Sequence, residues 1–359
     1  MKRVAVVTKK KNDILTILER TSGIQVEQLA PEGLGSCALA DFDAFVLLGG
    51  TEEAPCCLNG VDRFAMEKEI TKGKRVFAEF YESIGPDQYF LEKQSTRYSR
   101  MVYIAENGMI EGLSFGDILE EQCNVYTPKH MKSPLGKPLL ITQEHICAHD
   151  HVTPEAGFLD DEKNKTLWFE TESLLICNFR LCNFIRATFA PKKSWRRLLN
   201  FILSWVTETE VQTEVLPDHY TQGHYKAELS FEMQANAAVK RAMGWFDDAE
   251  ILLSEGRRGM REGFGTEIYP DGTRRRTMPI RDDCMGEVGM MYAMDYVVNG
   301  TARSLQIADN LFSYCFDYMQ RKNAGIFEGM IGWTDSAWGV CYTHDTGRLL
   351  VGELLKNMY

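Results

Sequence analysis

The sequence has no long hydrophobic run and no excess of basic residues. Its N-terminal apolar stretch, Val4 to Val7, is far too short for the core of a signal peptide or for a membrane span. Its 51 aspartate and glutamate residues outnumber 40 lysine and arginine residues, for a net charge of -11. Nucleic-acid binding needs basic groups against phosphates. We therefore expect a cytoplasmic protein with neither a membrane nor a nucleic-acid partner.

The common motifs of zinc, disulfide and phosphate sites are also missing. The ten cysteines are scattered and form no CxxC…CxxC pattern, so we expect buried free thiols, and neither zinc nor another cofactor. Gly49-Gly50-Thr51 lacks the GxGxxG or GxxxxGK spacing and is interpreted as a turn at the edge of a sheet.

One histidine-rich segment deserves a separate interpretation. It has an HxxxHDH spacing that resembles metal ligands, formed by His145, His149, Asp150 and His151. The run before it, Pro138 to Thr142, is strand-like, and strand geometry would scatter these side chains. A polar loop is the favoured interpretation, and a metal-dependent hydrolase is kept as a weaker alternative.

The length of 359 residues, with 44% hydrophobic and 25% charged residues, is typical of two globular domains. The first, over 1–210, alternates strand and helix patterns: strands at 3–7, 25–29, 43–49 and 75–80, with helices at 13–20 and from 61. This succession predicts a flavodoxin-like α/β domain with a doubly wound parallel sheet. Further strands follow at 101–104, 138–142, 166–169 and 174–179, and an amphipathic helix at 191–206 closes the domain.

The second domain, 211–359, is predicted to be mostly helical. Its periodicity indicates five helices, at 227–242, 245–255, 282–298, 302–321 and 344–358. Between the second and third lies a glycine-rich loop with a hairpin turn at Pro270-Asp271-Gly272. Five such helices cannot close a toroid of helical pairs. They should bury an open seam against the first domain or against another chain, which would make a homo-oligomer.

The first domain resembles the class I glutamine-amidotransferase-like (ThuA-like) proteins. The matching segments are RVAVV at 3–7, DAFVLLGG at 43–50, GKRVFAEFYES at 73–83, LLICNFRLCNF at 174–184 and ATFAPKKSWRRLLNFILSWV at 187–206. In the catalytic members a cysteine stands at a tight elbow after a central strand. The corresponding segment here, Phe77-Ala78-Glu79-Phe80-Tyr81, has no cysteine. The resemblance therefore implies an inactive scaffold with a structural or binding role.

The second domain resembles part of an (α/α) six-hairpin glycosidase toroid. The resemblance rests on RDDCMGE at 281–287, WTDSAW at 333–338 and HDTGR at 344–348. It covers about 135 residues, and a complete toroid would need roughly twice that length or more. The resemblance implies a carbohydrate ligand and a carboxylate-based site, in a domain that has only part of the helices of a complete toroid.

Three groups of residues could form that site. Asp282, Asp283 and Glu287 lie at the start of a predicted helix, where 283 and 287 share a face. Glycoside cleavage needs two carboxyl groups, one protonated and one ionised, and a shared site would separate their pKa values. Acidic residues are equally favoured at helix N-termini as caps, which is the alternative for Asp282 and Asp283.

The other two groups lie in and after the glycine-rich segment GMIGWTDSAWG. Trp333 and Trp338 could stack on a sugar ring with Asp335 binding hydroxyls, or they could simply fill the core between helices. His344, Asp345 and Arg348 can point one way from the start of the last helix, with Asp345 as a general acid. The alternative for this last group is a helix cap with an intrahelical ion pair.

Together these residues predict a carbohydrate-active protein that needs no cofactor or metal, possibly of the glycoside hydrolase class. The candidate acids are Asp282, Asp283, Glu287 and Asp345. The candidate residues for binding an oligosaccharide or glycoside are Arg281, Tyr269, Trp333, Asp335, Trp338, His344 and Arg348. The rival hypothesis is a non-catalytic carbohydrate-binding or assembly module built on an inactive amidotransferase-like scaffold.

Overall fold

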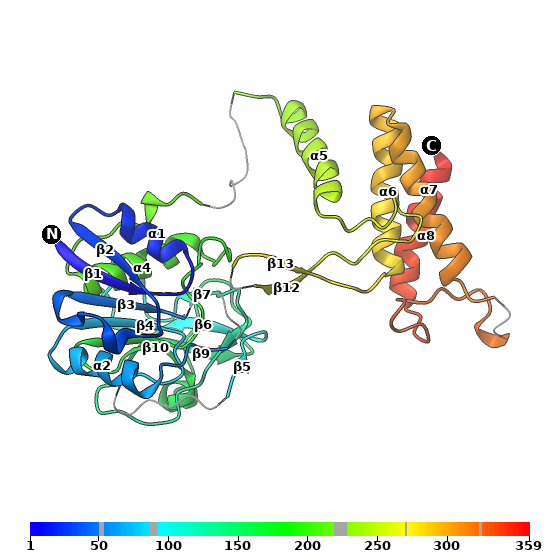
Figure 1. Cartoon of the computed structure of the whole chain (residues 1–359). Helices are drawn as coiled ribbons and strands as arrows, with labels where there is room; N and C mark the ends of the chain where they lie inside the picture. Colours follow the sequence, from blue (N-terminus) through cyan, green and yellow to red (C-terminus); the bar gives the residue numbers. More distant parts are fainter. Residues whose placement is uncertain (50–53, 86–91, 219–227, 270, 323–324) are drawn as a thin grey trace. The chain divides into compact units, whose positions relative to one another are not determined.

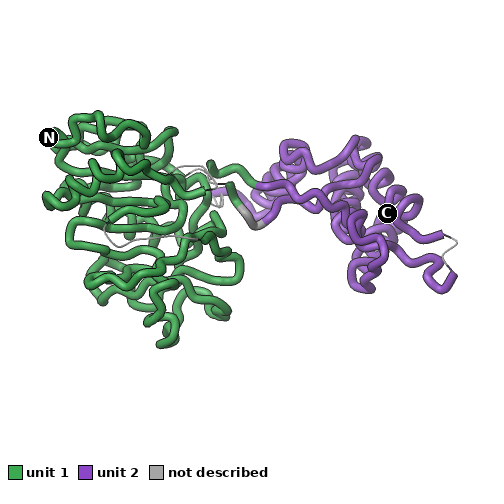
Figure 2. The backbone as a smooth tube through the Cα atoms, turned by 60° about the horizontal axis from the view of Figure 1, so that its bottom comes forward, with its two compact units in different colours: residues 1–220, 266–274 green, residues 221–265, 275–359 purple. Residues whose placement is uncertain are grey.

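The structure is a computed structural model that describes residues 1–49, 54–85, 92–218, 228–269, 271–322 and 325–359 (Figure 1). The chain forms two compact units (Figure 2). Unit 1 comprises Met1–Tyr220 and Thr266–Arg274, and unit 2 comprises Thr221–Gly265 and Arg275–Tyr359. The sequence pattern placed a single boundary at residue 210 and did not indicate that a later segment belongs to the first unit.

Unit 1 is built on a mixed sheet of nine strands in the order β2-β1-β3-β4-β11-β10-β9-β6-β7. The first five strands in this order are parallel, namely β2 (Ile24–Leu29), β1 (Lys2–Val7), β3 (Ala44–Leu48), β4 (Arg75–Glu79) and β11 (Leu174–Cys177). The other four pair antiparallel, namely β10 (Lys165–Phe169), β9 (Lys137–Glu144), β6 (Ser99–Tyr103) and β7 (Ile118–Leu119). A separate antiparallel pair joins β5 (Gln94–Ser95) to β8 (Val125–Tyr126).

Helices cover both faces of this sheet. Helices α1 (Asp13–Arg20) and α4 (Lys192–Thr207) lie on one face and α2 (Gly60–Thr71) on the other (Figure 1). A short helix, α3, spans Ala156–Asp160. Every residue of β3 is buried, as a parallel strand covered on both faces requires. The amphipathic stripe of α4 that the sequence predicted is fully buried, at Trp195, Leu198, Leu199, Ile202 and Val206.

The segment Thr266–Arg274 belongs to unit 1 although it follows α4 by many residues. It is the end of a two-stranded hairpin formed by β12 (Phe264–Ile268) and β13 (Arg274–Arg276). Ile268 is 6% exposed within the core cluster of unit 1, and its N–H donates to the carbonyl of Gln122 at 3.3 Å. The expected hairpin at 270–272 is therefore present, although Pro270 lies outside the described residues.

Unit 2 is helical, as the sequence indicated. Its helices are α5 (Phe231–Asp248), α6 (Asp282–Asn299), α7 (Ala302–Tyr314) and α8 (Thr343–Met358), and a π-helical turn, Cys315–Met319, continues α7. Helices α6 and α8 pack against each other closely because two glycines face the contact. A Cβ atom at Gly286 would overlap the backbone of Leu349, and one at Gly352 would overlap the carbonyl oxygen of Gly286. Only glycine permits this approach.

The expected pair of helices at 227–242 and 245–255 is wrong. One continuous helix, α5, crosses the expected break at Gly244, and the residues after it form a turn in which Leu252 pairs with Met260. A single glycine inside a helix costs only about 1 kcal/mol relative to alanine, so Gly244 does not end α5. Among the residues that the structure describes, no helix has the length and apolar character of a membrane span.

Candidate functional site

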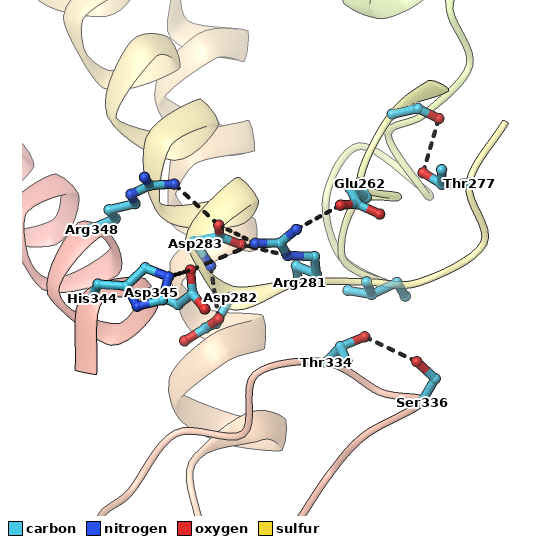
Figure 3. A network of polar contacts seen from close by, with 12 residues as sticks. Glu262, Thr277, Arg281, Asp282, Asp283, Thr334, Ser336, His344, Asp345 and Arg348 are labelled. Carbon is cyan, nitrogen blue, oxygen red and sulfur yellow. Dashed lines mark hydrogen bonds and ion pairs between the residues drawn. The ribbon is translucent and has the colours of Figure 1, made fainter. Parts of the chain in front are cut away.

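Three carboxylates of unit 2 gather where α6 and α8 begin. Asp282 and Asp283 occupy the first turn of α6, and Asp345 occupies the first turn of α8 (Figure 3). Their relative exposures are 0%, 2% and 1%. Acidic residues favour helix N-termini, but three buried carboxylates from two helices exceed what capping requires. The close crossing at Gly286 holds the two helix starts side by side.

Arg281 is the basic residue at the centre of this cluster. It grips Asp283 with two nitrogens, Nε at 3.0 Å from Oδ1 and Nη2 at 2.6 Å from Oδ2. Its Nη1 donates to Glu262 Oε1 at 2.6 Å, and its Nη2 lies 3.6 Å from Asp345 Oδ1. The guanidinium also stacks over Trp333, with Cζ 5.2 Å from the ring centroid. Arg281 therefore links residues from three segments of unit 2.

The three carboxyl groups differ in ionisation. Burial raises the pKa of Asp282 to about 7, and the charges of Asp283 and Asp345 act in the same direction. Burial opposes ionisation of Asp283 too, but the charge of Arg281, together with hydrogen bonds from the Cys284 backbone, Asp345 and Arg281, lowers the pKa of Asp283. Burial and the neighbouring Asp283 raise the pKa of Asp345. The cluster thus holds one ionised carboxylate beside two that retain protons more readily.

One oxygen of Asp282 is available for a further contact. Its Oδ1 accepts a hydrogen bond from the N–H of Asp283 at 2.9 Å, and its own N–H donates to the carbonyl of Trp333 at 3.1 Å. The other oxygen, Oδ2, is buried and has no hydrogen-bond partner among the described residues. An unpartnered buried carboxyl oxygen is costly to the fold and calls for an explanation.

The exposed side of the cluster carries basic and acidic groups. His344 Nε2 lies 3.1 Å from Asp345 Oδ1, and the His344 side chain is 67% exposed. Arg348 approaches Asp283 Oδ2 at 3.4 Å and Glu287 Oε1 at 3.5 Å, with half of its side chain exposed. Glu287 is itself 52% exposed, so its weak contact with Arg348 places it at the rim and not among the buried acids.

An aromatic row borders the same region. Trp333 meets Tyr342 edge-on with ring centroids 5.2 Å apart, and Tyr342 lies 5.6 Å from His344. Asp335 is not directed at the carboxylates by its contacts, since its Oδ1 accepts the N–H of Ile280 at 3.0 Å. Asp335 therefore fixes the chain just before Arg281, and its proposed contact with sugar hydroxyls stays a prediction.

The structure does not bring all the expected residues together. Tyr269 belongs to unit 1 and therefore to the other compact unit. Trp338 is 43% exposed and lies beside Gly332, and its carbonyl oxygen accepts a hydrogen bond from Arg321. Glu262, which was not among the expected site residues, is a direct partner of Arg281. The sequence did not predict Tyr342, although an aromatic residue two positions before the HDTGR segment is visible in it.

Unit 1 contains the position where the amidotransferase resemblance places a nucleophile. Phe80 follows β4 directly and adopts a left-handed conformation, with φ 54°. The preceding Glu79 is fully buried and accepts three backbone N–H groups, from Gly49 at 2.8 Å, Leu181 at 2.5 Å and Cys182 at 3.2 Å. Burial nonetheless raises the pKa of Glu79 to about 7. This elbow joins three loops at the ends of strands, and its left-handed residue is Phe80.

The thiol next to this elbow is not activated. The backbone of Cys56 pairs with Phe80 and Glu82, and burial raises the pKa of the Cys56 thiol. A nucleophilic cysteine requires a depressed pKa, so Cys56 does not have the character of an activated nucleophile. The Gly49-Gly50-Thr51 turn lies partly outside the described residues.

The histidine-rich segment does not assemble a metal site. His145 is 84% exposed with a left-handed φ of 57°, and His151 Nδ1 lies 3.8 Å from Asp117 Oδ1. Within the described part of the chain, no group of three or more histidine, cysteine or acidic side chains could hold a metal ion. The polar-loop interpretation accounts for these positions.

Neither a model of a known protein family nor a curated protein matches this sequence.

Proposed function

We propose that unit 2 carries a saccharide site of the glycoside hydrolase type, centred on Asp282, Asp283 and Asp345. The observation that carries the proposal is the divergence of their pKa values within one cluster: raised to about 7 for Asp282, raised for Asp345 and lowered for Asp283. Glycoside cleavage requires one protonated and one ionised carboxyl group. A cluster that served only as a helix cap would have no need for protonated members.

The roles of the residues follow from this difference. Asp282 or Asp345, which hold a proton more readily, would donate it to the leaving oxygen, and the ionised Asp283 would act as base or nucleophile. Arg281 keeps Asp283 ionised through its two hydrogen bonds. Trp333 and Tyr342 supply flat apolar faces suited to a sugar ring. The chemistry requires no cofactor.

The burial of the acids imposes a condition on this proposal. The carboxylates are almost inaccessible, whereas His344 and Arg348 are half or more exposed beside them. These two side chains are long or rotatable and are held by contacts of 3.1 to 3.5 Å at their ends. A sugar would reach the acids by displacing them, so they belong to the binding surface.

The test is a titration of the protein with a panel of mono- and disaccharides, and with aryl glycosides as substrates. We expect binding at millimolar sugar, and Asp345→Asn should reduce hydrolysis by at least about 100-fold, the typical contribution of a general acid. Asp317→Asn, on an exposed residue of the same unit, is the matched control and should behave as the wild type. Absence of any binding or hydrolysis across the panel would refute the proposal.

A non-catalytic binding or assembly module is the second candidate. It is supported by the elbow of unit 1, where Phe80 adopts a left-handed conformation and the segment 77–81 has no cysteine. The parallel strands of that unit follow the order β2-β1-β3-β4-β11, which supports a flavodoxin-like scaffold. In this alternative the helical seam is a subunit interface, and a hydrodynamic mass well above 40.9 kDa without sugar turnover would favour it.

A further inference from the structure

Unit 2 has a pocket that lies apart from the acidic cluster. It has a volume of about 400 Å³ and is lined by residues of α5, α6 and the start of α7. Tyr292 and Asp295 line it from the C-terminal half of α6. A helix rises about 1.5 Å per residue, so Tyr292 lies roughly 15 Å along α6 from Asp282. The volume is within the range of small-molecule sites, about 300–1,000 Å³.

One residue that lines this pocket, Tyr292, has a buried hydroxyl without a hydrogen-bond partner among the described residues. Tyr292 is only 2% exposed, and its ring packs against Phe246 in an edge-on arrangement with centroids 6.0 Å apart. Its Oη is buried and has no hydrogen-bond partner among the described residues. Burial raises the pKa of Tyr292 to about 12. The three charged groups that influence this pKa, Asp247, Arg303 and Asp295, all line the pocket.

The carboxylates of the pocket keep acceptor capacity. Asp247 is held by Arg303 through two hydrogen bonds, at 3.0 and 2.8 Å. Asp295 accepts from Ser304 at 2.5 Å and from Asn299 at 2.8 Å. Each carboxylate oxygen can accept two hydrogen bonds, so both groups can receive further donors from a ligand.

The balance of charge in the pocket favours a neutral ligand. Two acidic side chains, Asp247 and Asp295, face two basic ones, Lys240 and Arg303. A ligand with a net charge of either sign would be repelled by the pocket residues of the same sign. A molecule with several hydroxyl groups can instead donate to the carboxylates and exchange a hydrogen bond with Tyr292, without bringing a charge into the pocket.

We infer that this pocket binds a small neutral polyol of the monosaccharide or cyclitol class, with Tyr292 Oη as the buried contact and Asp295 and Asp247 as acceptors of ligand hydroxyls. The site is separate from the acidic cluster and does not depend on hydrolysis there. Tyr292 is the residue that determines specificity for a hydroxylated ligand, because its hydroxyl otherwise lacks a partner.

The experiment is calorimetric and NMR titration of the full chain with D-glucose and myo-inositol. Tyr292→Phe removes only the hydroxyl and should weaken binding about five- to tenfold, the usual effect of one neutral hydrogen bond. Tyr296→Phe is the matched control, because Tyr296 is on the same helix and is 39% exposed outside the pocket. It should bind as the wild type does. Thermal unfolding without ligand should not be lowered by Tyr292→Phe, because the hydroxyl has no partner to lose.

Asp345→Asn separates this site from the proposed hydrolase site, since it should leave polyol binding at the pocket unchanged. Failure of both polyols to bind would overturn the inference, and so would equal binding by the Tyr292→Phe and Tyr296→Phe variants. Binding of ethanolamine or acetate in place of the polyols would show that the pocket selects a charged ligand and would also overturn it. Loss of polyol binding in Asp345→Asn would assign that binding to the acidic cluster instead.

Discussion

At the scale of single residues, two neighbouring aspartates have different chemistry. Asp282 and Asp283 are adjacent in the sequence and both are buried, yet only Asp283 is paired with Arg281. The sequence predicted that both lie at the start of a helix, and the structure confirms that position. It could not predict their ionisation, because the partners of each side chain come from segments distant in the chain, such as Asp345 and Glu262.

The raised pKa of Asp282 has a measurable consequence. Its native value of about 7 exceeds the value of about 3.9 in an unfolded chain, so the folded state binds a proton that the unfolded state has released. The stability of unit 2 should therefore fall as pH rises from about 4 to 7, by up to about 1.4 kcal/mol per pH unit. The raised pKa of Asp345 acts in the same direction, whereas the lowered pKa of Asp283 affects stability below about pH 4.

Hydrogen exchange of the slowest amides in α6 and α7, measured across this pH range, would report that stability. We expect Asp282→Asn to flatten the dependence, because a neutral amide does not titrate. Asp317→Asn should keep the wild-type slope. Parallel profiles for wild type and Asp282→Asn would show that Asp282 is ionised in the folded protein at lower pH, and they would remove the basis for its role as an acid.

At the scale of elements, the site depends on how closely two helices cross. Regular patterns in the sequence predicted α6 and α8 nearly to their ends, because their boundaries coincide with Asn299-Gly300 and with the HDTGR segment. Sequence periodicity does not show which helices touch. The contact depends on Gly286 and Gly352, whose significance becomes visible only when the opposing backbone is known.

Gly286→Ala tests this crossing. The added methyl group would overlap the backbone of Leu349, and backbone cannot move aside as a side chain can. We expect a loss of about 1–3 kcal/mol of stability, the usual cost of overpacking. The measurement is chemical denaturation, together with the carboxyl carbon shift of Asp345, which should change as the helix starts separate.

The matched control is Gly347→Ala. Gly347 is on α8, and a Cβ atom there would have no heavy atom within 4 Å. Alanine favours the helix over glycine by up to about 1 kcal/mol, so this variant should be neutral or slightly more stable. If Gly286→Ala were as stable as Gly347→Ala and left the Asp345 signal in place, the crossing would not be what positions the acids.

At the scale of the whole molecule, neither unit is continuous in the sequence, because residues 266–274 belong to unit 1 and divide unit 2. Local patterns predicted most strands and helices of unit 1, since each is determined by residues within a short window. The sequence predicted a hairpin turn at 270–272, but it did not indicate that residues 266–274 belong to unit 1. Whether a distant segment joins unit 1 depends on the shape of the core into which Ile268 packs. No local sequence pattern encodes that shape.

Ile268→Ala tests this membership. Ile268 is 6% exposed in the core of unit 1, so truncation should cost that unit about 2–5 kcal/mol. Ile326→Ala, at a residue that is 91% exposed, should change stability by less than about 0.5 kcal/mol. The readout is hydrogen exchange of the central strands β1, β3 and β4, whose slowest amides report the unfolding of unit 1 itself. Faster exchange there in Ile268→Ala alone would establish that a segment beyond α4 completes the core, whereas unchanged exchange would show that unit 1 is stable without it.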